Sequence, residues 1–186
     1  MSRRGRPLPP LILMTDPARI PDPVVAAERL PRGSAVVFRA FGAEDAVEQG
    51  LRLAAVARRR GLVLLAGADA RLAIAIGAEG VHLPERLVNR ASAIRRAHPL
   101  WLITVAAHGE AAARRARLCG ADAVVISPVF ESRSPSAGPA LGPARLASLV
   151  RRTKRPVYAL GGVNAMTAAR LIGSGAAGIA AVEALA

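Results

Sequence analysis

The sequence predicts a single α/β domain in which eight parallel strands, with helices between them, close into a (β/α)8 barrel. Eight short apolar runs alternate with segments rich in Ala, Arg and Leu from one end of the chain to the other. The runs are continuously apolar, which is typical of parallel strands buried on both faces. A glycine pair, Gly161-Gly162, follows the seventh run, where barrels of this kind often bind phosphate.

Each expected strand is four or five residues long: Leu11–Thr15, Ala35–Phe38, Leu62–Ala66, Gly80–Leu83, Leu102–Ala106, Ala123–Ile126, Pro156–Leu160 and Gly178–Val182. Helices are expected between them, at Asp22–Leu30, Ala43–Arg60, Ala70–Ile76, Leu87–Ala97, Gly109–Leu118, Pro143–Thr153 and Ala165–Ile172. The same elements can also form an open, doubly wound sheet. Such a sheet carries its phosphate-binding glycines after the first strand, which here ends Met14-Thr15-Asp16-Pro17. We therefore predict a TIM barrel with short loops.

Length and composition limit the class of protein. The 186 residues are 52% hydrophobic and 21% charged, which suits one folded domain and excludes a disordered chain. No stretch reaches the roughly 18 uninterrupted apolar residues of a membrane span. Cys119 is the only cysteine, so no disulfide framework is expected. We expect a cytoplasmic protein with a basic tail at residues 1–10 and a barrel domain at residues 11–186.

The net charge of +13 raises the alternative of a nucleic-acid-binding protein. Nearly all of the positive charge is arginine, with Lys154 the only lysine, in a chain also rich in Ala, Gly and Pro. Proteins that bind single strands usually present aromatic stacking platforms, whereas the aromatic residues here are few and scattered. We therefore interpret the charge as a compositional bias on helix faces and keep nucleic acid as the least favoured partner.

Barrel enzymes carry their chemistry at the carboxyl ends of the strands. After the seventh strand the chain reads Leu160-Gly161-Gly162-Val163-Asn164, where glycine lets the backbone approach a ligand closely. The loop after the sixth strand, 127–138, is rich in hydroxyl groups that could fold over the same ligand. A tight turn and a solvated loop are the structural alternatives. The predicted phosphate-binding residues are Gly161, Gly162, Ser132, Ser134, Val182 and Glu183.

Titratable side chains follow other strands. His82 and His108 lie at adjacent strand ends, so they can share a pocket as acid and base, with Arg39 from the second strand beside them. Each histidine taken alone is more often structural. No arrangement suggests a Ser–His–Asp triad or a zinc site. Further residues expected in the substrate pocket are Asp69, Glu85, Ser127, Glu131 and Asn164.

The motifs Leu13-Met14-Thr15-Asp16, GAEGVHL at 77–83, SPVFES at 127–132 and LGGVN at 160–164 together resemble the thiamine phosphate synthase / TenI family. The resemblance covers nearly the whole chain, and GAEGVHL followed by SPVFES is fairly specific. It implies a TIM barrel. It also implies a reaction in which a pyrimidine diphosphate is joined to a thiazole phosphate while magnesium neutralises the departing pyrophosphate.

The resemblance implies that Gly161, Gly162, Ser132 and Ser134 hold the thiazole phosphate, with Glu183 where a serine is usual. The half of the family's site that handles magnesium and diphosphate is largely missing. The residues at its usual positions are Val37, Phe41, Gly67, Ala68, Leu87, Ala106 and Pro135. Magnesium and diphosphate need oxygen ligands and positive charge, so we expect no bound metal. In the TenI branch a histidine of the sixth loop is thought to transfer a proton, and here Pro128 stands in its place.

We therefore expect a divergent family member that binds a thiazole phosphate or a similar small phosphorylated molecule, with weak or absent synthase activity. If it is an enzyme, we favour proton transfer through His108 or His82. A non-catalytic binding or regulatory barrel is the alternative from another class. The true substrate, a homodimer and a partner protein that completes the pocket are left open by the sequence.

Overall fold

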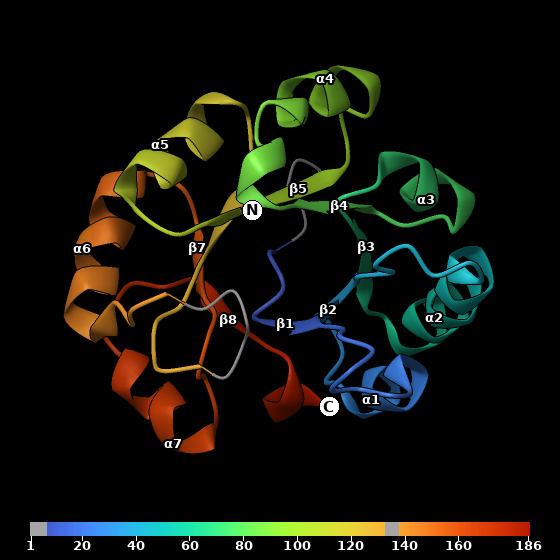
Figure 1. Ribbon diagram of the computed structural model, residues 1–186, viewed down its shortest axis with the longest axis horizontal. Coiled ribbons are helices and arrows are strands. Elements are labelled where there is room, and N and C mark those ends of the chain that lie inside the picture. The colour runs from blue at the N-terminus through green and yellow to red at the C-terminus, as the bar shows by residue number, and fades with distance from the viewer. Residues whose placement is uncertain (1–6, 133–137) are drawn as a thin grey trace.

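Eight parallel strands close into a barrel in the computed structural model, which describes residues 7–132 and 138–186 (Figure 1). Each strand pairs with the next along the chain, and the last pairs with the first. The strands are β1 (Leu11–Met14), β2 (Ala35–Phe38), β3 (Val63–Gly67), β4 (Gly80–Leu83), β5 (Leu102–Ala107), β6 (Ala123–Ile126), β7 (Val157–Ala159) and β8 (Gly178–Ala181). The predicted TIM barrel is confirmed, and the strand bounds differ from the expected ones by one residue at most.

Helices cover the outside of the barrel (Figure 1). They are α1 (Pro23–Arg29), α2 (Ala46–Arg60), α3 (Ala70–Ala75), α4 (Arg90–Ala97), α5 (Glu110–Leu118), α6 (Gly142–Thr153) and α7 (Ala165–Ala168). Short 3-10 turns η1 (Glu85–Leu87), η2 (Ala169–Leu171) and η3 (Glu183–Leu185) accompany them. Among the described residues, no helix is of a length and hydrophobicity that would carry it across a membrane.

Three helices are shorter than expected by three or more residues. The helix expected from Ala43 begins at Ala46. The helix expected from Leu87 begins at Arg90, because Pro84 starts the separate turn η1, where its carbonyl accepts the amide of Leu87 at 2.9 Å. The helix expected to reach Ile172 tightens into η2 after Ala168.

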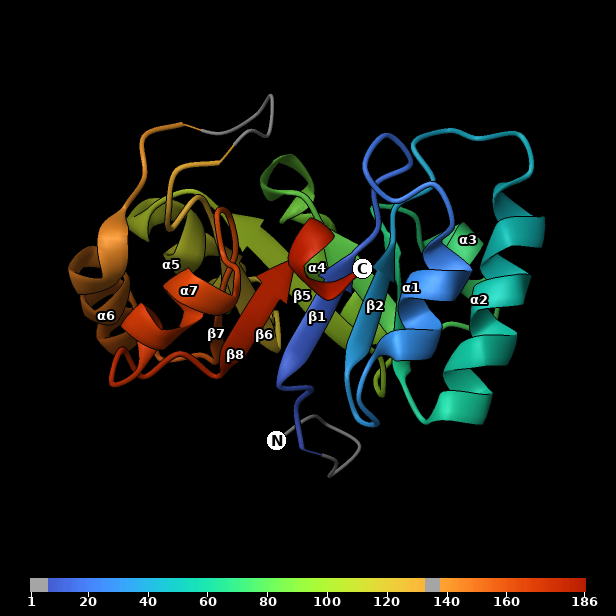
Figure 2. The same cartoon turned by 90° about the horizontal axis from the view of Figure 1, so that it is seen from below.

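Alternate residues of the strands fill two apolar layers. Side chains inside the barrel are Ile12, Met14, Ala35, Val37, Leu65, Leu102, Ala123, Val125, Tyr158 and Ala180. A larger cluster lies between the strands and the helices. At the amino end of the barrel the Tyr158 hydroxyl donates to the carbonyl of Pro9 at 2.8 Å, and the amide of Ile179 donates to the carbonyl of Pro10 at 3.1 Å. These contacts fix residues 9 and 10 to the end opposite the carboxyl ends of the strands (Figure 2).

A nearly buried ion pair ties α4 to the strands. The Arg95 guanidinium pairs with Asp122, and the two side chains are 12% and 9% exposed. The same carboxylate accepts the amide of Ile103 at 2.8 Å, while Arg95 donates to the carbonyl of Trp101 at 2.7 Å. This ion pair therefore holds the segments that lead into β5 and β6. The loops at the opposite ends of these strands are left to form a site.

Candidate functional site

A cavity of about 1300 Å³ opens at the carboxyl ends of the strands, and residues that follow all eight strands line it. The predicted site residues that line it are Arg39, Asp69, His82, His108, Ser127, Glu131, Ser132, Gly161, Gly162, Asn164, Val182 and Glu183. Glu85 is not among its lining residues. Ser134 lies outside the described residues. The fold thus brings side chains from distant parts of the sequence together around one cavity.

The glycine loop after β7 lies directly against the loop after β6. Gly161 and Gly162 have φ angles of 92° and 64°, in the left-handed region that favours glycine. A Cβ on Gly161 would lie 2.8 Å from the Cα of Pro128, and one on Gly162 would overlap the carbonyl oxygen of Glu131. Because no side chain fits at either position, both glycines are required for this close approach.

The glycine loop presents three consecutive backbone amides. Within the described residues, the N–H groups of Gly161, Gly162 and Val163 have no hydrogen-bond acceptor. Their carbonyl groups are used differently: that of Gly161 accepts the amide of Phe130 at 2.9 Å, and that of Gly162 accepts the Thr167 hydroxyl at 2.9 Å. Successive N–H groups in a turn with left-handed residues form a concavity that binds anions.

Three other predicted phosphate-binding residues, Val182, Glu183 and Ser132, line the same cavity. Val182 and Glu183 continue from β8 into η3, and Ser132 belongs to the loop after β6. Glu183 and Glu131 are exposed, so their carboxylates remain accessible to solvent. Asn164 caps α7, since its Oδ1 accepts the amides of Met166 and Thr167 at 2.9 and 3.0 Å. The side chain of Asn164 therefore shapes the end of the loop.

His108 stands on the cavity wall between β5 and β6. Its Nδ1 lies 2.8 Å from the carbonyl oxygen of Ser127, and its amide donates to Glu85 at 3.1 Å. A carbonyl only accepts, so Nδ1 carries the hydrogen and Nε2 of the neutral ring keeps a lone pair. Glu85 also accepts from Arg115 at 2.9 Å. Glu85 thus holds the loop that carries His108, rather than lining the cavity as the sequence suggested.

His82 is buried at the floor of the same cavity. Its Nδ1 lies 2.9 Å from the hydroxyl of Thr104 on β5. Burial, together with the charge of nearby Arg39, lowers the pKa of His82 to about 4. The ring is therefore neutral at neutral pH and can serve as a hydrogen-bonding group of the floor, whereas protonation of this ring is strongly disfavoured.

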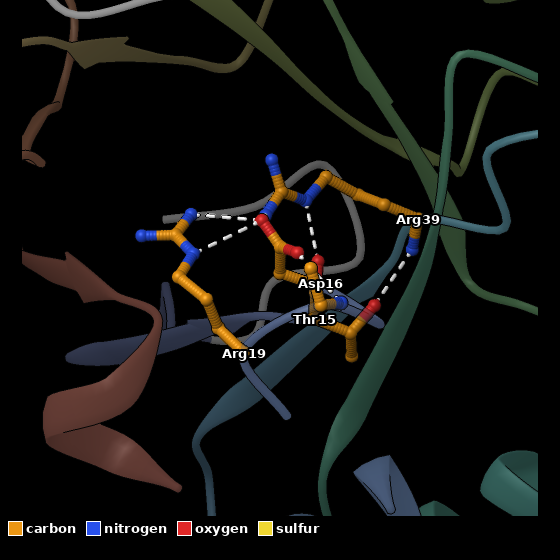
Figure 3. A network of polar contacts seen from close by, with 5 residues as sticks. Thr15, Asp16, Arg19 and Arg39 are labelled. Atoms are coloured by element: carbon orange, nitrogen blue, oxygen red, sulfur yellow. Dashed lines mark hydrogen bonds and ion pairs between the residues drawn. The ribbon is translucent and has the colours of Figure 1, made fainter. Parts of the chain in front are cut away.

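Arg39 reaches the cavity from the end of β2 through a network with the end of β1 (Figure 3). Its Nε donates to the carbonyl of Thr15 at 2.6 Å and its amide donates to the Thr15 hydroxyl at 2.9 Å. Its Nη2 lies 3.3 Å from Oδ2 of Asp16, and Nη2 of Arg19 lies 2.8 Å from the same oxygen. One carboxylate therefore orients two guanidinium groups.

The charges in this network act on one another. Burial would raise the pKa of Asp16, but hydrogen bonds from Arg19 and from the amide of Ala18, with the charges of Arg19 and Arg39, hold it below its usual range. Burial lowers the pKa of Arg39, and the charge of Asp16 opposes that change. An arginine stays protonated even so, and the network remains ionised at neutral pH.

Three basic residues of the cavity were not anticipated from the sequence: Arg19, Arg71 and Arg86. Each follows the end of a strand by three to five residues. That position is the one signal that could have found them, because loops after strands meet at the mouth of the barrel.

The described residues supply few side-chain ligands for the magnesium ion that the family resemblance implies. No group of three or more His, Cys, Asp or Glu side chains within the described ranges could hold a metal, and the remaining residues include none of these types. Asp69, the carboxylate nearest the expected position, uses Oδ1 to cap α3 by accepting the amide of Arg71 at 2.7 Å. A magnesium ion at this site would therefore depend largely on oxygens of water and of a bound ligand.

A family model described as thiamine monophosphate synthase matches residues 11–185. The chain belongs to this thiamine monophosphate synthase family. It is 39% identical over 115 residues to a thiamine-phosphate synthase of Methanoculleus marisnigri, covering 61% of this chain and 54% of that protein. It is 32% identical over 144 residues to a thiamine-phosphate synthase of Roseiflexus sp., covering 77% of this chain and 61% of that protein. The chain thus spans less than two thirds of either relative.

A solved structure shares this fold. A thiamine phosphate pyrophosphorylase from Pyrococcus furiosus superposes with a TM-score of 0.79 at 24% identity, over 94% of this chain and 85% of that one. At this level of identity the likeness concerns the barrel itself. The chemistry of the mouth has to be argued from the residues that this chain carries.

Proposed function

We propose that this family member binds a small phosphorylated ring compound of the thiazole phosphate type, with the phosphate on the glycine loop after β7. The observation that carries the proposal is the set of three consecutive amides, at Gly161, Gly162 and Val163, that face no acceptor within the described residues. Hydrogen bonds to a charged acceptor contribute about 1.5–3 kcal/mol each. The curated relatives are thiamine-phosphate synthases by name, and we extend a role in thiamine biosynthesis to this chain.

We further propose that the chemistry of this site is proton transfer through His108. The hydrogen bond to Ser127 leaves Nε2 of His108 with a lone pair. Nε2 can take a proton from one atom of the bound ligand and return it to another, so the net reaction is an isomerisation that needs no second reactant. His82, whose pKa is held near 4, supports the cavity floor in this scheme.

Ala184 offers a direct test of the phosphate position. It lines the cavity from η3, is exposed and bears no polar group, so a longer side chain fits there without disturbing the core. We compare Ala184→Glu with Ala184→Gln, which has the same shape without the charge. The carboxylate should weaken binding of thiazole phosphate about tenfold relative to the amide by like-charge repulsion, measured by calorimetry. Equal affinities would place the phosphate elsewhere.

The proposed proton transfer is tested by a separate measurement. In deuterated water the protein should exchange a carbon-bound hydrogen of the bound ligand, followed by NMR. A protein that binds thiazole phosphate and exchanges no hydrogen would be a binding barrel, which contradicts the catalytic part of the proposal and keeps the phosphate site.

A further inference from the structure

The three amides of the glycine loop belong to three consecutive peptide units, and each unit is held through its carbonyl group. The carbonyl of Leu160 shares a unit with the N–H of Gly161 and accepts the amide of Val129 at 2.9 Å. The carbonyl of Gly161 shares a unit with the N–H of Gly162 and accepts the amide of Phe130 at 2.9 Å. The backbone of the loop after β6 therefore holds the first two units.

A side chain holds the third peptide unit. The carbonyl of Gly162 shares this unit with the N–H of Val163, and it accepts the hydroxyl of Thr167 at 2.9 Å. A hydroxyl has one hydrogen to donate, and two other acceptors, both on Asn164, lie farther from it, at 3.4 Å. The hydroxyl oxygen in turn accepts the amide of Asn164 at 2.9 Å. These contacts fix the Thr167 hydroxyl in the orientation that binds the Gly162 carbonyl.

Holding a carbonyl also sets the direction of the amide in the same peptide unit. The three units are trans, and the C=O and N–H bonds of a trans peptide point in opposite directions. Each carbonyl points toward its donor in the protein, so each amide points away from that donor. Gly161, Gly162 and Val163 all line the cavity. A hydrogen bond to the carbonyl also polarises the peptide, which strengthens its N–H as a donor to an anion.

The cap of α7 accounts for only part of the contacts of Thr167. Oδ1 of Asn164 accepts the amides of Met166 and Thr167 at 2.9 and 3.0 Å, so the first turn of the helix is capped by that side chain. Gly162 precedes Asn164 by two residues and lies outside α7. The bond from the Thr167 hydroxyl to the Gly162 carbonyl therefore acts on the glycine loop rather than on the helix.

We propose that Thr167 is a positioning residue for anion recognition. Its hydroxyl holds the third peptide unit so that the N–H of Val163 donates to the same phosphate as those of Gly161 and Gly162. Thr167 is not among the described residues that line the cavity, so it acts through Gly162 rather than by touching the ligand. This inference rests on the proposed function, because it concerns the same phosphate.

The test compares Thr167→Val, which keeps the shape of the side chain and loses the hydroxyl, with Thr167→Ser, which keeps the hydroxyl. Calorimetry measures the affinities for thiazole phosphate and for thiazole alcohol. Thr167→Val should bind the ester about tenfold more weakly, the loss expected for one hydrogen bond to a charged acceptor, and should bind the alcohol like the parent. Thr167→Ser should bind both ligands like the parent.

Thr153→Val is the matched control. Thr153 is buried, and its hydroxyl donates to the carbonyl of Leu149 at 2.6 Å within α6. The variant thus removes a hydroxyl from a backbone carbonyl at a position that does not line the cavity. It should bind the ester and the alcohol like the parent, whatever its effect on stability.

NMR adds a measurement that a general loss of stability would not change. In the parent, thiazole phosphate should shift the amide protons of Gly161, Gly162 and Val163. In Thr167→Val the shift should be lost at Val163 and kept at the two glycines. Three results would overturn the inference: parent-like ester affinity in Thr167→Val, a full shift at Val163 in that variant, or a loss of affinity that Thr167→Ser shares.

The proposed function fails separately if the parent protein binds the ester no more tightly than the alcohol. Inorganic phosphate then replaces the ester in the same NMR titration. A shift at Val163 that requires the Thr167 hydroxyl would still support Thr167 as a positioning residue for an anion. No shift at Val163 in the parent would overturn that role as well.

Discussion

Nδ1 of His108 donates a hydrogen bond to the carbonyl oxygen of Ser127 over 2.8 Å, and this contact joins the ends of β5 and β6 on the cavity wall. Ser127 precedes Pro128, whose Cα would lie 2.8 Å from a Cβ on Gly161. The orientation of the imidazole and the position of the glycine loop are therefore set by the same segment of chain. The proposed base and the proposed anion site are therefore held by one segment, which favours a fixed geometry relative to a bound ligand.

His108→Gln tests the role of the imidazole. The variant keeps a hydrogen-bond donor for Ser127 but has no group that can take up a proton near neutral pH. We expect exchange of ligand hydrogen with deuterated water to fall about 100-fold or more, with thiazole phosphate affinity within a few fold of the parent. The control is His98→Gln, because His98 lies at the end of α4, stacks on Trp101 and is not among the cavity-lining residues. Unchanged exchange in His108→Gln would remove His108 from the mechanism.

Stability should fall between neutral pH and pH 4 because of His82. Its pKa is about 4 in the folded protein and ordinary, 6.5, in the unfolded chain. The unfolded state therefore binds the proton first as pH falls, and the stability present above pH 6.5 is lost down to pH 4, by up to about 3 kcal/mol. In urea unfolding, His82→Gln should lose less stability over this interval. An identical pH dependence in the parent and the variant would contradict the assignment.

Magnesium-dependent synthase turnover should be negligible. The positions expected to hold magnesium and diphosphate carry Gly67, Ala68 and Leu87, and no metal-ligand cluster is found in the described ranges. The assay supplies the pyrimidine diphosphate, thiazole phosphate and magnesium. Turnover of about 1 per second or more, typical of enzymes, would contradict this prediction and would require a ligand set different from the one considered above.

The barrel could be predicted because continuous apolar runs report burial on both faces of a strand. Gly161 and His108 could be assigned to the opening of the barrel for a related reason, since Gly161 directly follows a predicted strand and His108 comes two residues after one. The first residues of the helices were harder to predict. Pro84 starts the separate turn η1. Only the folded loop shows that α4 begins at Arg90, three residues after the end of that turn.

The arginines of the cavity could not be assigned from the sequence in the same way. Arg19 faces the cavity because Asp16 holds its guanidinium, and that depends on the turn after β1. Glu85 follows β4 as a pocket residue would, yet its carboxylate contacts Arg115, 30 residues further along the chain. The Glu85–Arg115 pair is long-range and carries no local signal, so the position of Glu85 is decided only once the chain has folded.

Asp122→Ala should be strongly destabilising. It removes the partner of Arg95 and the acceptor of the Ile103 amide, in a pair whose two side chains are nearly buried. Removing one member of a buried pair costs about 3–5 kcal/mol. Glu110→Ala, which breaks the exposed pair with Arg152, should cost under about 1 kcal/mol. Chemical denaturation compares the two variants, and similar losses would show that the Arg95–Asp122 pair has no special weight.

The central claim is that the glycine loop recognises a phosphate group. Calorimetric titration of the parent protein with thiazole phosphate and with the corresponding thiazole alcohol tests it most directly, because the two ligands differ in that group alone. With two or more amides donating to a charged phosphate, the ester should bind about 100-fold more tightly than the alcohol. Equal affinities for the ester and the alcohol would contradict the claim.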